Sequence, residues 1–283
     1  MQIINTVCGI REVINAWRVA GETVAFVPTM GNLHAGHLQL VNRAKKSADR
    51  VVVSIFVNPT QFGLGEDFEA YPRTELEDQE KLEIEGADLL FLPSVSDIYA
   101  PDVKTIITVT GISDSYCGSF RPGHFSGVAT VVCKLLNIVQ PNVALFGLKD
   151  FQQFAVIKLM VRDLNIPVEI LGVDTVRESS GLALSSRNGY LTQDERMNAS
   201  ALYVSLCAAR DAILAGSQNY EDIEKKAIQS IQQAGFQADY FSVCRSSDLK
   251  KANLDDVDLV LLVAAKLGKT RLIDNVYFSK QVV

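Results

Sequence analysis

The segment from Pro28 to His37 carries two histidines three residues apart, where an apolar run gives way to a helical pattern. Thr23 to Val27 is predicted to be a short buried strand, and apolar positions with helical spacing follow Gly36, so a glycine-bearing turn and a helix come next. The start of a helix presents unpaired backbone N–H groups and the positive end of its dipole to an anion. Because His34 and His37 share a face and Gly36 leaves the backbone open, the residues favour a phosphate site. A polar helix start without a ligand is an equal alternative.

The histidine pair is also half of the ligand set that a zinc site needs. The chain contains three histidines, and no cysteine or acidic residue near the pair completes such a set. We therefore predict no metal site formed by side chains of the protein.

Two amide side chains follow the next strand-like run, in the turn-rich segment Val57 to Gly63. Asn58 and Gln61 are expected near the carboxyl edge of the sheet, where neutral amides bind hydroxyl and carbonyl groups without adding charge. An ordinary Asn-Pro turn with a solvated glutamine explains the same residues equally well.

A second pattern of strand, glycine, cation and helix occupies Phe146 to Gln153. Lys149 can reach a phosphate from this position, and Gln153 lies one turn into the helix. Asp150 is better explained as a helix cap than as a catalyst.

The loop from Gly181 to Asn188 places two hydroxyl groups before a guanidinium, at Ser185, Ser186 and Arg187. Such residues can clamp phosphate oxygens, although polar linkers have the same composition. Arg121 to His124 adds a further cation and imidazole, for which a solvated turn is the better interpretation. The sequence contains no catalytic triad, P-loop or GxGxxG fingerprint, which argues against P-loop hydrolysis and hydride transfer.

The composition indicates a substantial hydrophobic core and no excess of positive charge. Its 283 residues are 48% hydrophobic, with a net charge of −6 and a pI near 5.2. These values argue against a broad nucleic-acid or acidic-membrane surface and still permit small anions through local charge. We expect no signal peptide, no membrane span and reduced thiols at the five cysteines, hence a cytoplasmic protein.

Apolar runs of strand length alternate with helical patterns over the first part of the chain. The predicted strands are Thr23–Val27, Val51–Val57, Leu89–Leu92, Thr105–Val109, Val143–Phe146 and Val168–Val173. This alternation predicts an α/β fold, with a Rossmann-like parallel sheet and helices on both faces. Ligands of such sheets bind at the carboxyl ends of the strands, where the motif-bearing loops gather.

After the Ser-Ser-Arg loop the pattern changes. The predicted elements are helices at Asp194–Gly216 and Asp222–Gly235 and short strands at Asp239–Cys244, Leu259–Ala264 and Arg271–Asp274. We therefore predict a Rossmann-like domain over residues 1–176 and a smaller C-terminal α+β domain over residues 177–283, which carries the Ser-Ser-Arg loop at its start.

Taken in order, these segments resemble the pantothenate synthetases, or pantoate:β-alanine ligases, over essentially the whole chain. The resemblance rests on Pro28–His37, Phe56–Gly63, Ala70–Thr74, Arg121–Gly127, Phe146–Gln153 and Leu184–Asn188. Several long motifs in register are far more specific than an HxGH alone. That family belongs to the HxGH nucleotidyltransferase-like group, and its Ser-Ser-Arg loop is similar to the second phosphate-binding signature of the group.

The resemblance implies that the protein condenses pantoate with β-alanine, in pantothenate biosynthesis on the coenzyme A pathway. ATP is then cleaved to AMP and pyrophosphate through an enzyme-bound pantoyl adenylate. The implied catalytic residues are His34, His37, Lys149 and Arg187, with His37 as proton donor to the departing pyrophosphate. The implied ATP-binding residues are Met30, Gly31, Asn32, Leu33, His34, Ala35, Gly36, His37, Gly147, Leu148, Lys149, Asp150, Val176, Leu184, Ser185, Ser186 and Arg187.

The resemblance also implies the other ligands and partners. Gln61 and Gln153 would bind pantoate. Mg²⁺ would ride on the ATP phosphates, since it keeps much of its water and needs few protein ligands, and Asp78 is a candidate outer-shell helper. No tightly bound organic cofactor, no nucleic-acid or membrane partner, and a homodimer are expected.

One residue departs from the family pattern. Leu148 stands where the family usually has the glutamate of Gly-Glu-Lys-Asp, so ATP binding would differ or weaken if that glutamate orients Lys149 or the nucleotide. The alternatives are another HxGH-type enzyme, such as a nucleotidyltransferase or tRNA synthetase, and a non-catalytic ATP-binding sensor. A ligase releases AMP, whereas nucleotidyl transfer leaves the nucleotide on its product, and no anticodon-binding region or basic face supports a tRNA role.

Overall fold

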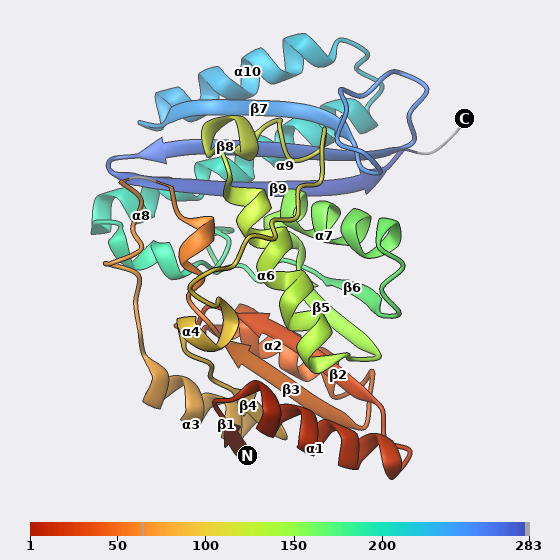
Figure 1. Cartoon of the computed structure of the whole chain (residues 1–283). Coiled ribbons are helices and arrows are strands. Elements are labelled where there is room, and N and C mark those ends of the chain that lie inside the picture. Colours follow the sequence, from red (N-terminus) through yellow and green to blue (C-terminus); the bar gives the residue numbers. More distant parts are fainter. Residues whose placement is uncertain (64, 281–283) are drawn as a thin grey trace. The chain divides into compact units, whose positions relative to one another are not determined.

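The chain forms two compact units, each with its own sheet (Figure 1). The computed structural model describes residues 1–63 and 65–280. The first unit comprises Met1–Leu148 and Val156–Asp174, and the second comprises Lys149–Ala155 and Thr175–Val283. The domains predicted from the sequence, 1–176 and 177–283, remain a prediction, and the segment Lys149–Ala155 groups with the second unit.

Six parallel strands make the sheet of the first unit. They are β1 (Gln2–Ile4), β2 (Val24–Thr29), β3 (Arg50–Ile55), β4 (Leu89–Phe91), β5 (Val143–Gly147) and β6 (Glu169–Val173), in the order β1-β4-β3-β2-β5-β6. The strand order reverses between β2 and β5, and ligands of open α/β sheets bind at the carboxyl ends of strands at such a switch point. The predicted α/β fold with a Rossmann-like parallel sheet is confirmed.

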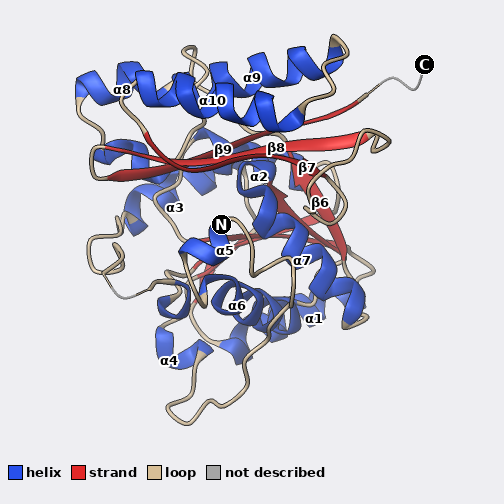
Figure 2. Ribbon diagram, turned by 90° about the horizontal axis from the view of Figure 1, so that it is seen from above, coloured by secondary structure: helices blue, strands red, loops and turns tan. Residues whose placement is uncertain are grey.

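Helices cover both faces of this sheet (Figure 2). On one face α2 (Ala35–Ala44) and α3 (Glu75–Glu85) bury Val27, Val53 and Leu145. On the other, α6 (His124–Val139) packs against β2 and α1 (Val7–Val19) packs against α6. Because both faces are buried, the central strands are continuous apolar runs. The remaining elements are α4 (Val95–Ile98), α5 (Cys117–Phe120), α7 (Phe151–Asp163) and the 3-10 turns η1 (Pro59–Gln61) and η2 (Leu148–Asp150).

The second unit is built on an antiparallel sheet of three strands. These are β7 (Gln237–Arg245), β8 (Asp258–Leu267) and β9 (Thr270–Ser279), in the order β7-β8-β9. Helices α9 (Ala201–Leu214) and α10 (Tyr220–Gln233) pack on one face and bury alternate β8 residues, Leu259, Leu261 and Val263. Preceding them are η3 (Ser186–Tyr190) and α8 (Gln193–Ala199). The predicted smaller α+β part is confirmed.

Two predicted elements differ from the structure. The segment Thr105–Val109 has a strand-like pattern, but it forms no strand in the described part of the chain, and Ile106 is 73% exposed. The Ile107 N–H bonds to the Thr130 hydroxyl instead of to a neighbouring strand. The single helix predicted over Asp194–Gly216 is two helices that meet at Ser200. The strand-like pattern at Thr105–Val109 thus did not indicate whether a neighbouring strand would be present to pair with it.

Gly127 lets α6 approach η1, the turn that ends at Gln61. A Cβ atom at Gly127 would lie 2.3 Å from the Thr60 carbonyl oxygen and 2.8 Å from the Gln61 Cα. Both neighbours are backbone atoms, so neither can move aside without shifting the turn. The absence of a side chain at this position therefore places Gln61.

We expect Gly127→Ala to destabilise the protein by about 1 to 3 kcal/mol, because the added methyl group overpacks against backbone. The thermal melting temperature measures this loss, and a shift of several degrees is expected. The matched control is Gly189→Ala, where an added Cβ meets nothing within 4 Å and the melting temperature should stay at the wild-type value. Equal melting temperatures for the two variants would contradict the close approach.

Candidate active site

The loop that contains the HxGH motif follows β2 and turns sharply. Gly31 and Asn32 have positive φ angles of 80° and 51°, and this conformation costs a non-glycine residue about 1 to 2 kcal/mol. Leu33 anchors the turn in the core beneath α2, where it is 3% exposed. The turn leads the chain from the carboxyl end of β2 to His34, the N-cap of α2.

The two imidazoles lie against each other at the start of α2, with ring centroids 4.1 Å apart. The Gly36 N–H donates to Nδ1 of His34 at 3.1 Å, and the His34 N–H donates to Nδ1 of His37 at 3.3 Å. A neutral imidazole whose Nδ1 accepts a hydrogen bond carries its proton on Nε2. Both neutral rings are therefore set as Nε2 donors at a helix N-terminus, where the backbone dipole also favours an anion.

A buried carboxylate holds the HxGH loop. Asp78, in the first turn of α3, has no solvent exposure, and its oxygens accept hydrogen bonds from the N–H groups of Asn32 and Leu33, each at 2.7 Å. Lys81 lies 3.8 Å from Asp78 and donates to the Leu33 carbonyl at 2.9 Å. Asp78 thus binds the N–H group of Leu33, and Lys81 binds its carbonyl oxygen. Both carboxylate oxygens of Asp78 bind the HxGH loop, and these are the atoms that an outer-shell role toward Mg²⁺ would use.

Gln61 and Met30, both predicted site residues, meet in the first unit. Asn58 donates from Nδ2 to Gln61 Oε1 at 3.0 Å, which orients the Gln61 amide and leaves its Nε2 directed at the Met30 sulfur, 2.9 Å away. A thioether is a weak acceptor, so a carboxylate or hydroxyl oxygen is a better partner for this N–H. Gln61 is 9% exposed, and its donor is therefore set before a ligand arrives.

Arg121 and His124 bond to the backbone of Gln61, and the predicted solvated turn is wrong. Glu66 accepts two bonds from Arg121, at 2.6 and 2.5 Å. Arg121 Nη1 lies 3.0 Å from His124 Nε2, and His124 Nδ1 lies 2.8 Å from the Gln61 carbonyl oxygen. Because arginine only donates, His124 accepts through Nε2 and donates through Nδ1. Although burial raises it, the bonds from Arg121 hold the pKa of Glu66 below its ordinary value.

Gly147 ends β5, and Leu148 turns back onto the sheet. Leu148 is 8% exposed, and a Cβ atom on Gly172 of β6 would lie 2.6 Å from its Cδ2 atom. The leucine therefore fills the space above a glycine of the neighbouring strand. In this protein, position 148 is an apolar packing position.

In the second unit, Lys149 and Asp150 form an ion pair. The Lys149 Nζ atom lies 3.9 Å from Asp150 Oδ1, and the Lys149 side chain is 19% exposed. Asn275 of β9 donates to the Lys149 carbonyl oxygen at 2.8 Å, so the backbone of this segment is tied to the sheet. Gln153 is partly buried in the first turn of α7.

The Ser-Ser-Arg loop forms one side of a short hairpin in the second unit. The Leu184 N–H donates to the Val176 carbonyl at 2.9 Å, which brings two predicted ATP-binding residues together. Ser185 caps η3 by accepting from the Arg187 N–H at 3.3 Å. Ser186 and Arg187 therefore lie in the first turn of η3, with their backbone direction set by the hairpin.

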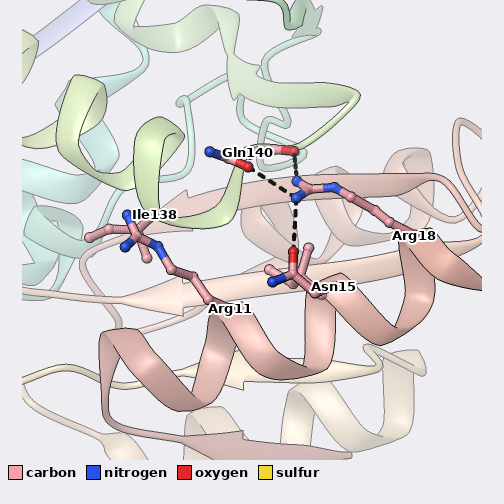
Figure 3. Close-up of a pocket in the computed structure, with 6 residues that line it drawn as sticks. Arg11, Asn15, Arg18, Ile138 and Gln140 are labelled. Atoms are coloured by element: carbon pink, nitrogen blue, oxygen red, sulfur yellow. Dashed lines mark hydrogen bonds between the residues drawn. The ribbon is translucent and has the colours of Figure 1, made fainter.

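A pocket of about 310 Å³ in the first unit contains none of the predicted site residues. It is lined by Arg11, Ile14, Asn15, Arg18, Ile138 and Gln140 (Figure 3). Arg18 donates to the Val139 carbonyl at 3.1 Å and to Gln140 Oε1 at 3.0 Å, and Arg11 donates to the Asn137 carbonyl at 3.4 Å. These arginines lie at the C-terminal end of α6, where cations stabilise the last carbonyl groups and the helix dipole.

Within residues 1–63 and 65–280, no three or more His, Cys, Asp or Glu side chains gather in a way that could hold a metal ion. In the same part of the chain, no helix is long and apolar enough to cross a membrane.

The fold and these groups define an α/β protein of the HxGH type, with a pair of imidazole donors at the switch point of a parallel sheet. Comparisons with known proteins agree. The pantoate-beta-alanine ligase family matches residues 2–277. The chain is 54% identical to the pantothenate synthetase of Methylococcus capsulatus, over 99% of this chain and 98% of that protein. It is 55% identical to that of Shewanella loihica, over 99% and 100%.

Solved structures show the same similarity. The pantothenate synthetase of Thermus thermophilus matches with a TM-score of 0.90 and 42% identity, over 98% of this chain and 99% of that one. The ligase of Francisella tularensis, solved in complex with beta-gamma ATP and β-alanine, matches with a TM-score of 0.81 and 37% identity, over 98% and 97%. The chain therefore belongs to the pantoate-beta-alanine ligase family, and it is an enzyme of the ligase class.

The sequence singled out Asp78 only as an outer-shell helper to Mg²⁺ and did not reveal that this side chain holds the HxGH loop. Asp78 stands beside Glu75 and Glu77 in the first turn of α3, and nothing in the sequence indicates which of the three acids contacts the loop. Only the contact with the HxGH loop distinguishes Asp78, which is buried, from Glu77, which is exposed. A lysine one turn further along, Lys81, was the available signal that an acid in this helix is paired.

We expect Asp78→Asn to loosen the HxGH loop. An amide has a single acceptor oxygen, so one buried N–H of the loop loses its partner, which costs about 1 to 3 kcal/mol. Differential scanning calorimetry should show a lower melting temperature, and titration calorimetry should show weaker ATP binding. Glu77→Gln removes the same charge from the same helix turn and should leave both unchanged. Equal effects of the two variants would show that the loop does not depend on Asp78.

Proposed function

We propose that this protein joins pantoate to β-alanine in an ATP-dependent condensation that yields pantothenate, AMP and pyrophosphate. The observation that carries the proposal is the pair of imidazoles set as Nε2 donors at the start of α2, beside the switch point of the sheet. Membership of the ligase family supports it, as does the similar Francisella enzyme solved with ATP and β-alanine.

The chemistry requires activation of pantoate before the amine attacks. A free carboxylate would have to expel oxide, whereas an acyl adenylate expels AMP. In the first step a pantoate oxygen attacks the α-phosphorus in line, pyrophosphate leaves, and negative charge grows on the equatorial and leaving oxygens. In the second step the amine of β-alanine attacks the acyl carbon, the bond to AMP breaks, and an amide forms. The enzyme must therefore supply fixed donors to phosphate oxygens.

His34 and His37 supply such donors from Nε2. Proton donation by His37 to pyrophosphate would require the imidazolium form, in which Nδ1 also carries a proton and cannot accept from the His34 N–H. We therefore assign to His37 a hydrogen bond to the leaving group, in place of the full proton transfer that the family resemblance implies.

Gln61 and Gln153 are the proposed pantoate-binding residues. Asn58 holds the Gln61 amide so that its Nε2 donates, and a pantoate oxygen replaces the weak sulfur acceptor of Met30. A neutral amide binds the hydroxyl or carboxylate of pantoate without stabilising the ground state as strongly as a cation would.

The second unit supplies the other proposed phosphate ligands: Lys149, Ser185, Ser186 and Arg187. Ammonium and guanidinium groups give charge-assisted hydrogen bonds to phosphate, and the two hydroxyls add neutral donors. The remaining proposed ATP-binding residues are Met30, Gly31, Asn32, Leu33, Ala35, Gly36, Gly147, Leu148, Asp150, Val176 and Leu184.

Mg²⁺ is proposed to accompany ATP and to neutralise charge on its phosphates. The residues fit a metal held mainly by phosphate and water, since Asp78 is bonded to the loop and no group of three or more His, Cys, Asp or Glu side chains that could hold a metal occurs in residues 1–63 and 65–280. A homodimer, the absence of a nucleic-acid partner and a cytoplasmic location remain predictions.

The purified protein is expected to form AMP from ATP only when pantoate is present, and pantothenate only when β-alanine is added. Chromatographic separation of nucleotides and mass detection of pantothenate measure both products. A nucleotide that stays attached to the product would favour a nucleotidyltransferase, the nearest alternative. ATP that binds but stays intact under both conditions would favour a sensor.

His37→Ala should lower the single-turnover rate of adenylate formation by about a hundredfold, the typical effect of removing one preorganised donor. His37→Gln is the control, because glutamine at this helix position keeps the capping acceptor for the His34 N–H. It should melt like the wild type, and because its amide also offers an N–H donor it should retain more of the rate than the alanine variant. A near-normal rate for His37→Ala would remove His37 from its proposed role.

A further inference from the structure

A buried ion pair in the second unit ties the hairpin over residues 176–184 to β9. The Arg177 guanidinium donates two parallel bonds to Asp274, at 2.6 and 2.9 Å. The Asp274 side chain is 4% exposed and that of Arg177 is 17% exposed. Arg177 also donates to the carbonyl oxygens of Gly181 at 3.1 Å and Asn275 at 3.2 Å. One guanidinium thus binds both the hairpin turn and the strand.

The next residue of β9 extends this network to Lys149. Asn275 donates from Nδ2 to the Lys149 carbonyl at 2.8 Å, and its own N–H donates to Asp274 at 2.7 Å. Burial raises the pKa of the Asp274 carboxyl, and Arg177 and Lys149 limit the rise. Asp274 therefore lies at the centre of a network that holds the backbone of Lys149 on one side and the hairpin on the other.

Stability alone does not explain a polar network at this place. Moving two charges out of water costs several kcal/mol, so a buried ion pair is often replaced by apolar residues without loss of stability. The same sheet already packs through an apolar cluster that includes Leu261 and Val263. Apolar side chains could hold β9 equally well, but they could not bind the Lys149 carbonyl. The polar network therefore fixes the backbone orientation of two chain segments, the hairpin over residues 176–184 and the segment at Lys149.

We propose that Arg177, Asp274 and Asn275 are positioning residues that keep Lys149 and the Ser-Ser-Arg hairpin in one arrangement suited to a phosphate chain. This rests on the proposed function, in which Lys149 and the loop bind the phosphates of ATP. The three residues act through the backbone of those segments and do not contact the nucleotide. Preorganised donors bind developing charge best, so an ammonium that is displaced loses effect although its charge is intact.

The test is a double-mutant cycle on ATP affinity. Asn275→Ala removes the bond to the Lys149 carbonyl without adding a charge, and the Kd of ATP from titration calorimetry should rise about tenfold. In the Lys149→Ala background the same change should alter the Kd by less than about twofold, because the ammonium that it positions is gone. A purely structural role would weaken binding by the same factor in both backgrounds.

Asp239→Asn is the matched control. It breaks the Arg271–Asp239 pair of the same sheet, 2.7 Å apart and similarly buried, and should leave the Kd of ATP unchanged. Melting curves establish that each variant is folded at the assay temperature. If Asn275→Ala is not folded at that temperature, Asp274→Asn takes its place in the cycle, because it keeps the shape of the side chain. The expected result is the same: a smaller change in the Kd of ATP in the Lys149→Ala background than in the wild type.

The outcomes separate the two proposals. A wild-type protein that fails to bind ATP would refute the proposed function itself. Wild-type binding that Lys149→Ala weakens, but that Asn275→Ala leaves unchanged or weakens additively, would overturn the positioning role and leave the proposed function standing.

Discussion

The hydrogen bonds from the Asn32 and Leu33 N–H groups to the Asp78 carboxylate constrain the whole site of the first unit. Gly31 adopts its positive φ angle freely, but Asn32 does so at an energetic cost, which the surrounding contacts must offset. These bonds fix the residue at which α2 begins, so that His34 becomes the N-cap of the helix. The Nδ1 atoms of His34 and His37 then accept backbone hydrogen bonds, which places the proton of each neutral imidazole on Nε2. The Asp78 carboxylate thus helps to orient the two imidazoles through the backbone of the loop that precedes them.

The second unit uses a buried aspartate in a related way. Asp274 accepts from the Arg177 guanidinium and from the Asn275 N–H, while Asn275 holds the Lys149 carbonyl. A buried polar network stabilises a single arrangement only when its members find partners. In each unit a buried carboxylate therefore helps to hold loops that carry proposed phosphate-binding residues. Asp78 binds the HxGH loop directly, whereas Asp274 acts through Arg177 and Asn275.

The departure at Leu148 fits this picture. The leucine packs over Gly172, so it stabilises the end of β5 by apolar contact. The backbone of Lys149 is held by Asn275, and its ammonium has Asp150 as an ionic partner. Orientation of Lys149 in this protein therefore does not need an acidic neighbour at position 148, which is consistent with membership of a ligase family in which glutamate usually stands there.

The sequence by itself determined the α/β class, the succession of strands and the residue types that can bind phosphate, because apolar periodicity and glycine-bearing turns are local signals. It also carried a family resemblance that named the candidate ligand-binding residues. Only the tertiary structure decided which residues have partners. Thr105–Val109 has the pattern of a strand and pairs with none in the described chain, and Asp78 differs from Glu77 only by its contact with a loop 45 residues away. Spacing along a chain encodes conformation, whereas a buried hydrogen bond depends on residues that meet only after folding.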